Sequence, residues 1–126
     1  KDIENNQVVL VRRDTNEKII VKNNELCEMI DKLLNDIHNN MYKMAKENLD
    51  KNTSIAKNMN EFKEILKNKN SFIKAMWCGN EECVLKIKEE TSATSRCIPF
   101  EQENLLDTCV CCGKDAKKEV IFAKAY

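Results

Sequence analysis

Apolar residues gather in two short runs near the start of the chain, at 8–11 and 19–21, with a polar stretch at 14–17 between them. Runs rich in valine and isoleucine on both sides of a polar turn predict a β-hairpin over residues 7–22. Because a two-stranded hairpin is only marginally stable in water, we expect it to belong to a larger sheet upstream of Lys1. We therefore expect the chain to be a piece of a longer protein.

From residue 26 onward the apolar positions recur at steps of three and four, which is the period of an amphipathic helix. They predict one long helix from about 25 to 48, capped by Asn23 or Asn24. The polar stretch 50–57 interrupts the pattern, and Asn58 and Glu61 then have the spacing of a capping box. A second, shorter helix should therefore follow and end near 68–70.

The character of the sequence changes again at Ser71, where short apolar runs alternate with polar loops. The pattern predicts strands and one short helix, in the order strand 72–77, helix 81–90, strand 95–100 and strand 119–123. The predicted fold class is α+β, with a β-hairpin, long amphipathic helices and then a small α/β module. The corresponding segments are 1–24, 25–70 and 71–126.

Composition narrows the classes of protein to which the chain can belong. With 126 residues, 42% of them hydrophobic, it can bury a core without disulfide support. Its 21 basic and 21 acidic residues cancel, so charge gives no sign of a surface for nucleic acid. There is no run of eighteen apolar residues and no secretory signal pattern. We expect a cytoplasmic protein without a membrane partner.

Six of the seven cysteines fall between residues 78 and 112. In a reducing cytosol, clustered cysteines are more often metal ligands than disulfide partners. Four residues separate Cys78 from Cys83, and two separate Cys109 from Cys112. Two such pairs on separate loops predict a structural zinc site, because a closed shell of four sulfurs leaves no open position for catalysis.

The neighbours of the proposed ligands support the same prediction. Both glycines of the chain, Gly79 and Gly113, directly follow a proposed ligand, and at Gly113 a positive φ would let the loop wrap around the metal. Four thiolates around a divalent cation leave a negative site. We expect Lys86, Lys114 and Lys117 to offset part of that charge.

The remaining cysteines leave alternatives open. Cys111 competes with Cys109 and Cys112 for the metal, and only the pair spacing favours the latter two. Cys97 is expected to pack as a small hydrophobic residue, and no role is predicted for Cys27. The alternatives to a metal site are a module with buried thiols, or a reactive dithiol formed by the second pair.

Several strings along the chain resemble those of one family. They are Lys1–Thr15, Trp77–Gly79, Lys88–Thr91, Arg96–Phe100, Cys112–Lys114 and Phe122–Tyr126. Their order is similar to that of the C-terminal region of prolyl-tRNA synthetases of the archaeal and eukaryotic-like type. The resemblance spans essentially the whole chain. It implies that the hairpin is the end of an α/β anticodon-binding domain and that segment 71–126 is a zinc-binding C-terminal domain.

The resemblance also implies what the complete enzyme does. It would be a homodimeric class II ligase that activates proline with ATP and magnesium and transfers it to tRNA-Pro. The catalytic motifs of that family are absent here, so this chain alone is expected to be inactive. Cys78, Cys83, Cys109 and Cys112 coincide with the family's four-cysteine metal pattern, and Tyr126 would lie toward the catalytic domain.

Recognition of tRNA is the other role that the resemblance implies. Arg12, Arg13 and Lys18 lie on the hairpin that corresponds to the anticodon-contacting region, and such side chains can bind guanine edges and phosphates. Without the rest of that domain, we expect the chain to bind tRNA-Pro only weakly. Two other functions remain open: a free-standing zinc-ribbon-like module that binds nucleic acid or protein, and a thiol-redox enzyme.

Overall fold

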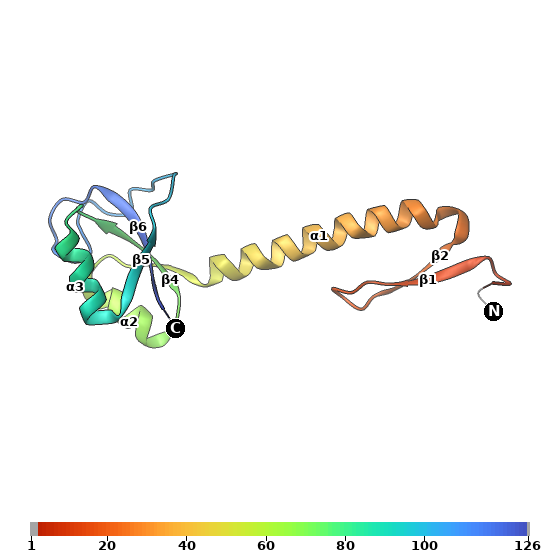
Figure 1. Cartoon of the computed structure of the whole chain (residues 1–126), viewed down its shortest axis with the longest axis horizontal. Coiled ribbons are helices and arrows are strands. Elements are labelled where there is room, and N and C mark those ends of the chain that lie inside the picture. The colour runs from red at the N-terminus through yellow and green to blue at the C-terminus, as the bar shows by residue number, and fades with distance from the viewer. Residues whose placement is uncertain (1–2, 126) are drawn as a thin grey trace. The chain divides into compact units, whose positions relative to one another are not determined.

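The computed structural model describes residues 3–125 (Figure 1). The chain divides into two compact units, Lys1–Asn48 and Leu49–Tyr126. This division differs from the three segments predicted from the sequence, whose boundaries stay a prediction. Within the described residues, no helix combines the length and the apolar character that crossing a membrane requires.

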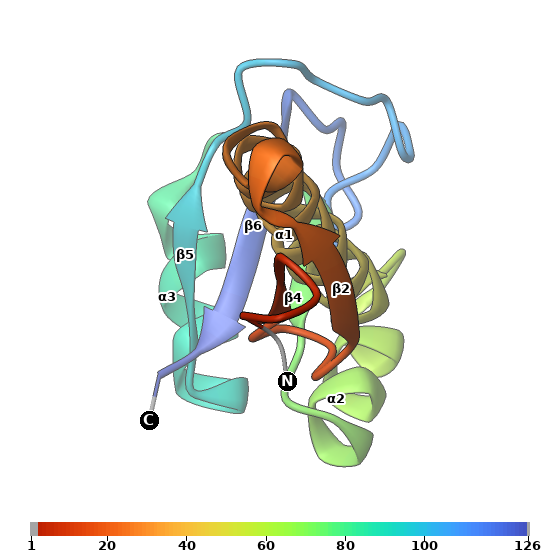
Figure 2. The ribbon, with the colours of Figure 1, turned by 90° about the vertical axis from the view of Figure 1, so that its right-hand side faces the viewer.

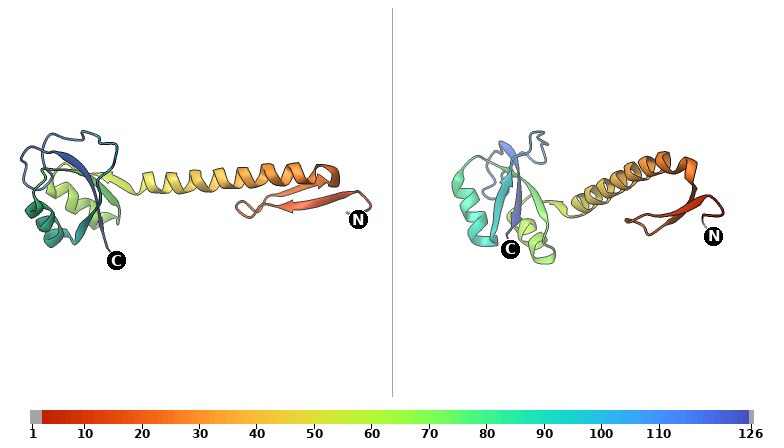
Figure 3. Two further views of the ribbon diagram at one scale, coloured as in Figure 1. Left: turned by 45° about the horizontal axis from the view of Figure 1, so that its top comes forward. Right: turned by 45° about the vertical axis from the view of Figure 1, so that its right-hand side comes forward.

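The first unit contains a β-hairpin and most of one long helix. Its elements are β1 (Gln7–Val11), β2 (Lys18–Lys22), a 3-10 turn (Asn23–Glu25) and α1 (Leu26–Lys51). The two strands pair antiparallel, and Asn16 adopts a left-handed φ of 60° in the turn between them. The hairpin runs beside the first part of α1 (Figure 3). The predicted hairpin and long helix are thus confirmed.

A carboxylate ties the hairpin turn to α1. Asp14 accepts hydrogen bonds from Arg12 Nε and Nη2, at 3.1 and 2.8 Å, and from Asn40 Nδ2 at 2.8 Å. The side chains of Arg12 and Asp14 are only 14% and 7% exposed. The hydrogen bonds from Arg12, and after them the one from Asn40, hold the pKa of Asp14 well below its usual range.

The second unit is a four-stranded sheet with two helices on one face. Its elements are β3 (Thr53–Ile55), α2 (Met59–Asn68), β4 (Phe72–Trp77), α3 (Glu81–Thr91), β5 (Ala93–Cys97) and β6 (Lys118–Lys124). The strand order is β3-β4-β6-β5, with β3 parallel to β4 and β6 antiparallel to both of its neighbours. Helices α2 and α3 cover the same face of this sheet (Figure 2).

The core lies between these helices and the sheet. Phe62 of α2 and Phe122 of β6 are fully buried and meet edge to face, with ring centroids 5.6 Å apart and an interplanar angle of 77°. Ile73 lies opposite Phe122 in the sheet register, and Ile87 of α3 completes the buried cluster. Alternate residues of β4 and β6 therefore face the helices, as period-two patterning requires.

The other face of the sheet carries a buried glutamate. Glu119 on β6 is 0% exposed; its Oε2 accepts the N–H of Glu103 at 3.0 Å, and its Oε1 lies 3.4 Å from Lys74 Nζ. Burial opposes the charge of Lys74, but the carboxylates of Glu103 and Glu119 outweigh burial and raise its pKa. These contacts hold the loop around Glu103 against β4 and β6, and this loop precedes the second pair of cysteines in the sequence.

The local predictions succeed better than the long-range ones. Asn58 Oδ1 accepts the N–H of Glu61 at 3.0 Å, as expected for the cap of α2. The strand expected at 95–100 is displaced, because Ser92 ends α3 with a left-handed φ of 61° and the chain enters β5 at Ala93. Strand β3 was not predicted, because its three residues lie in a polar stretch and pair only with the distant β4.

Replacing Phe62 with alanine should destabilise the second unit. The lost edge-to-face contact and the cavity left behind predict a loss of about 3–5 kcal/mol in the free energy of unfolding. The fully exposed Phe100 offers the matched control, and Phe100→Ala should change stability by less than about 0.5 kcal/mol. Denaturation followed by the fluorescence of the single tryptophan, Trp77, measures both. Equal losses in the two variants would refute this packing.

The Asp14 contact should make the stability of the first unit depend on pH. A folded-state pKa below the ordinary value of 3.8 stabilises the fold fully above that value, and the stabilisation is lost as pH falls toward the folded-state pKa. The difference in thermal midpoint between the native chain and Asp14→Asn should therefore be full at neutral pH and shrink below about pH 4. Helical circular dichroism measures it, with the exposed Asp31→Asn as control. A difference that does not change with pH would contradict the ion pair.

Candidate metal centre

The first pair of cysteines lies where β4 passes into α3. Cys78 directly follows β4, Gly79 turns the chain with a φ of 91°, and Cys83 sits in the first turn of α3. Trp77 Nε1 donates to the carbonyl of Asn80 at 2.9 Å and braces this loop. The positive end of the helix dipole favours a thiolate at Cys83.

The second pair lies in a tight loop that folds back on itself. Thr108 and Asp115 form an isolated antiparallel bridge. Inside it, the N–H of Cys109 donates to the carbonyl of Lys114 at 2.7 Å, and the N–H of Gly113 donates to the carbonyl of Cys109 at 2.9 Å. Gly113 has a φ of 69°, which few residues other than glycine adopt readily. The loop is therefore closed by its own backbone.

Backbone hydrogen bonds also join the two loops to each other. The N–H of Val110 donates to the carbonyl of Met76 at 2.9 Å, and the N–H of Lys117 donates to the carbonyl of Trp77 at 2.8 Å. Met76 and Trp77 are the last residues of β4 before Cys78. The peptide that carries the second pair is thus held against the peptide that carries the first.

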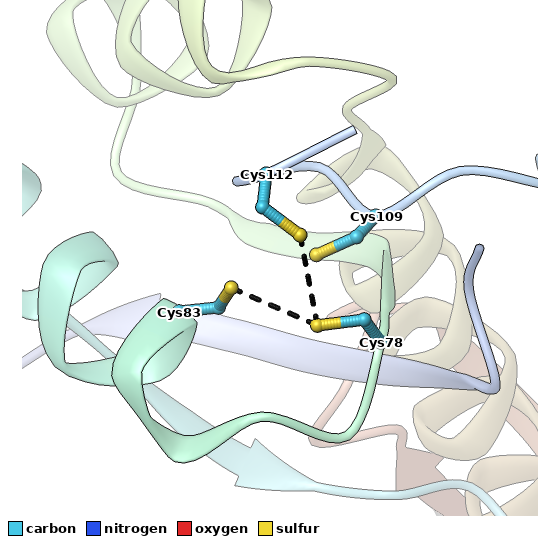
Figure 4. A group of neighbouring side chains, drawn as sticks. All are labelled: Cys78, Cys83, Cys109 and Cys112. Atoms are coloured by element: carbon cyan, nitrogen blue, oxygen red, sulfur yellow. Dashed lines mark hydrogen bonds between the residues drawn. The ribbon is translucent and has the colours of Figure 1, made fainter. Parts of the chain in front are cut away.

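The four sulfurs meet between these loops (Figure 4). The Sγ of Cys78 lies 3.7 Å from that of Cys83 and 3.7 Å from that of Cys112. With Cys109 included, all four sulfurs lie within 4.8 Å of one another. Tetrahedral zinc with bonds of about 2.3 Å places its sulfur ligands about 3.8 Å apart. The spacing fits a tetrahedral metal, and thiolates suit zinc or iron.

The electrostatics of the site also suit a cation. Burial raises the pKa of the Cys83 thiol, and burial raises that of Cys109 even though backbone amides of neighbouring residues point at its sulfur. A backbone hydrogen bond from Lys114 lowers the pKa of Cys112 to about 7. Buried thiolates at Cys83 and Cys109 are costly unless a positive ion lies beside them.

The other residues singled out from the sequence lie at different distances from this centre. Lys114 and Lys117 line a hollow beside the sulfurs, whereas Lys86 is not among its lining residues. Cys111 packs against the hydrophobic core and is not part of the sulfur cluster. Cys97 is exposed, so the prediction that it packs as a small hydrophobic residue is wrong, because β5 ends at this position.

The three candidate RNA-binding residues do not have equivalent surroundings. Arg13 and Lys18 are exposed, but the guanidinium of Arg12 is already paired with Asp14. Sequence reasoning did not single out Asp14 or Asn40, although an aspartate two residues after an arginine in a turn is a local signal for such a pair. Tyr126, the candidate interdomain residue, lies outside the described residues.

Comparison with known proteins gives consistent matches. The family described as "Prolyl-tRNA synthetase, C-terminal" matches residues 59–126. The proline–tRNA ligase of Clostridium novyi (strain NT) is 56% identical over 126 residues, which are 100% of this chain and 26% of that protein. Proline–tRNA ligase 2 of Bacillus cereus (strain ZK / E33L) is 55% identical over the same shares of the two chains.

A solved structure extends the likeness to the fold. The crystal structure of prolyl-tRNA synthetase from Cryptosporidium parvum, complexed with halofuginone and AMPPNP, matches with a TM-score of 0.90 and 32% identity. The match covers 99% of this chain and 27% of that one. The chain therefore spans about a quarter of the length of the relatives that it matches. These matches show that the chain belongs to the C-terminal family of prolyl-tRNA synthetases.

Proposed function

We propose that this chain is the non-catalytic C-terminal region of a proline–tRNA ligase and that its second unit is a structural zinc domain. The observation that carries the proposal is the set of four sulfurs at tetrahedral spacing, in a chain 56% identical throughout to a proline–tRNA ligase. The complete cytoplasmic enzyme would be a homodimer that joins proline to tRNA-Pro with ATP and magnesium. Its reaction would take place in another region of the polypeptide.

A structural role follows from the donor set. Four thiolates fill a tetrahedral shell, so a bound zinc ion would have no position for water or substrate. Cys78 and Cys83 would hold it from one loop, and Cys109 and Cys112 from the other. The ion would neutralise buried negative charge and cross-link two loops that the backbone already holds together. The domain would in this way support the catalytic body and tRNA binding.

The first unit supports an assignment to the anticodon-binding domain. Val21 is the one buried hydrophobic side chain among its described residues, while Val9, Ile20 and Leu34 are 44%, 66% and 59% exposed. A hairpin with so little core needs a larger sheet to cover it. Exposed Arg13 and Lys18 remain candidates for contacts with tRNA-Pro, whereas Arg12 would first have to leave Asp14. Tyr126 remains a candidate contact with the catalytic domain.

Replacing Cys78 with serine should remove the zinc and weaken the second unit. We expect one zinc ion per native chain, far less in Cys78→Ser, and a loss of roughly 3 kcal/mol or more in unfolding free energy, because structural metal binding is coupled to folding. The exposed Cys97→Ser is the matched control and should keep both zinc and stability. Elemental analysis and Trp77 fluorescence measure the two effects. Unchanged metal content and melting in Cys78→Ser would contradict the proposal.

The isolated chain should not activate proline. Since the reaction is assigned to another region, proline-dependent exchange between ATP and pyrophosphate should stay at the level of a reaction without protein. A full-length proline–tRNA ligase, such as that of Clostridium novyi, gives the positive control in the same assay. Exchange that depends on both this chain and proline would overturn the assignment.

A further inference from the structure

We propose that Cys112 is the modification site through which peroxides and thiol-reactive electrophiles attack the sulfur cluster, with Cys78 as the thiol that resolves the oxidised sulfur and releases the metal. This inference rests on the proposed zinc site and adds a chemical reactivity to it. It concerns Cys112 in particular, because the four sulfurs differ in their exposure to solvent.

Burial separates the four thiols. Cys83 and Cys109 are only 6% and 2% exposed, Cys78 is half-buried and Cys112 is exposed. The hollow beside the cluster is lined by Cys112, Cys78 and Cys83 but not by Cys109. A small reagent that enters from solvent therefore meets the sulfur of Cys112 first.

The position of Cys78 makes it the resolving thiol. Its Sγ lies 3.7 Å from the Sγ of Cys112, so a disulfide bond of about 2.05 Å requires the two sulfurs to approach by roughly 1.7 Å. Cys78 lies between β4 and α3 and belongs to neither element. Cys83 is instead fixed within α3, and Cys109 is held by the backbone bonds of its tight loop.

The reaction balances with hydrogen peroxide as the oxidant. The Cys112 thiolate attacks one peroxide oxygen, the O–O bond breaks, and hydroxide leaves as the sulfenic acid forms. The Cys78 thiolate then attacks that sulfur, forms the Cys78–Cys112 disulfide and expels a second hydroxide. Two electrons pass from two thiolates to one peroxide. Zinc keeps only two thiolate ligands, and its affinity for the site falls.

The test uses the zinc-loaded chain with its other cysteines replaced, as Cys27→Ser, Cys97→Ser and Cys111→Ala. Treatment with hydrogen peroxide should release one zinc ion per Cys78–Cys112 disulfide. A chelating dye measures the zinc, and fragmentation of the linked tryptic peptides identifies the bond. A predominant disulfide between Cys109 and Cys112, or between Cys78 and Cys83, would overturn the inference.

A second measurement uses the unsubstituted chain and does not depend on those replacements. Brief labelling with N-ethylmaleimide should modify Cys112 at least about 10-fold more than Cys83 or Cys109, with the exposed Cys27 and Cys97 as internal standards. Equal labelling of all four cluster cysteines would refute the inference. A preparation that binds no zinc would overturn the proposed metal site and the release of metal, whereas the disulfide map and the labelling order would still test Cys112 as the attacked thiol and Cys78 as the resolving one.

Discussion

The pairing of β4 with β6 is the constraint on which the metal centre depends. These strands are antiparallel neighbours, so the last residues of β4 lie beside the first residues of β6, with Trp77 opposite Lys118. The loop that leaves β4 carries Cys78 and the loop that enters β6 carries Cys112, although 34 positions separate them along the chain. Two backbone hydrogen bonds, from Val110 and Lys117 to the end of β4, complete the register. The sulfurs converge because the sheet brings their loops together.

The parts of this site that could be predicted from the sequence are those with a local cause. The pair spacings, the positive φ of Gly113 and the cap of α2 each follow from a few adjacent residues. Burial depends on distant partners and was harder to predict. Cys97 has an apolar neighbour in the sequence but is exposed where β5 ends, whereas the charged Glu119 is fully buried because Lys74 and Glu103 meet it there. Periodicity contains no information about those contacts.

The hairpin shows the same limit in its electrostatics. Arg12 and Arg13 are identical in type and adjacent in sequence, but their surroundings differ. Arg12 is paired with Asp14, which also accepts a hydrogen bond from Asn40, while Arg13 stays exposed. A basic residue on a strand can serve folding or recognition, and only the position of its counter-charge distinguishes the two. The low pKa of Asp14 shows that Arg12 is engaged within the fold, because the hydrogen bonds from Arg12 stabilise the ionised carboxyl.

The four sulfurs are buried to different degrees, and this difference bears on what the proposed metal does for the fold. The thiols of Cys83 and Cys109 have raised pKa values, so without a cation they take up protons and become neutral rather than remaining as buried charges. The backbone bonds between the loops and the core around Phe62 and Phe122 do not involve sulfur. A metal bound here would therefore add stability to a sheet that has its own core.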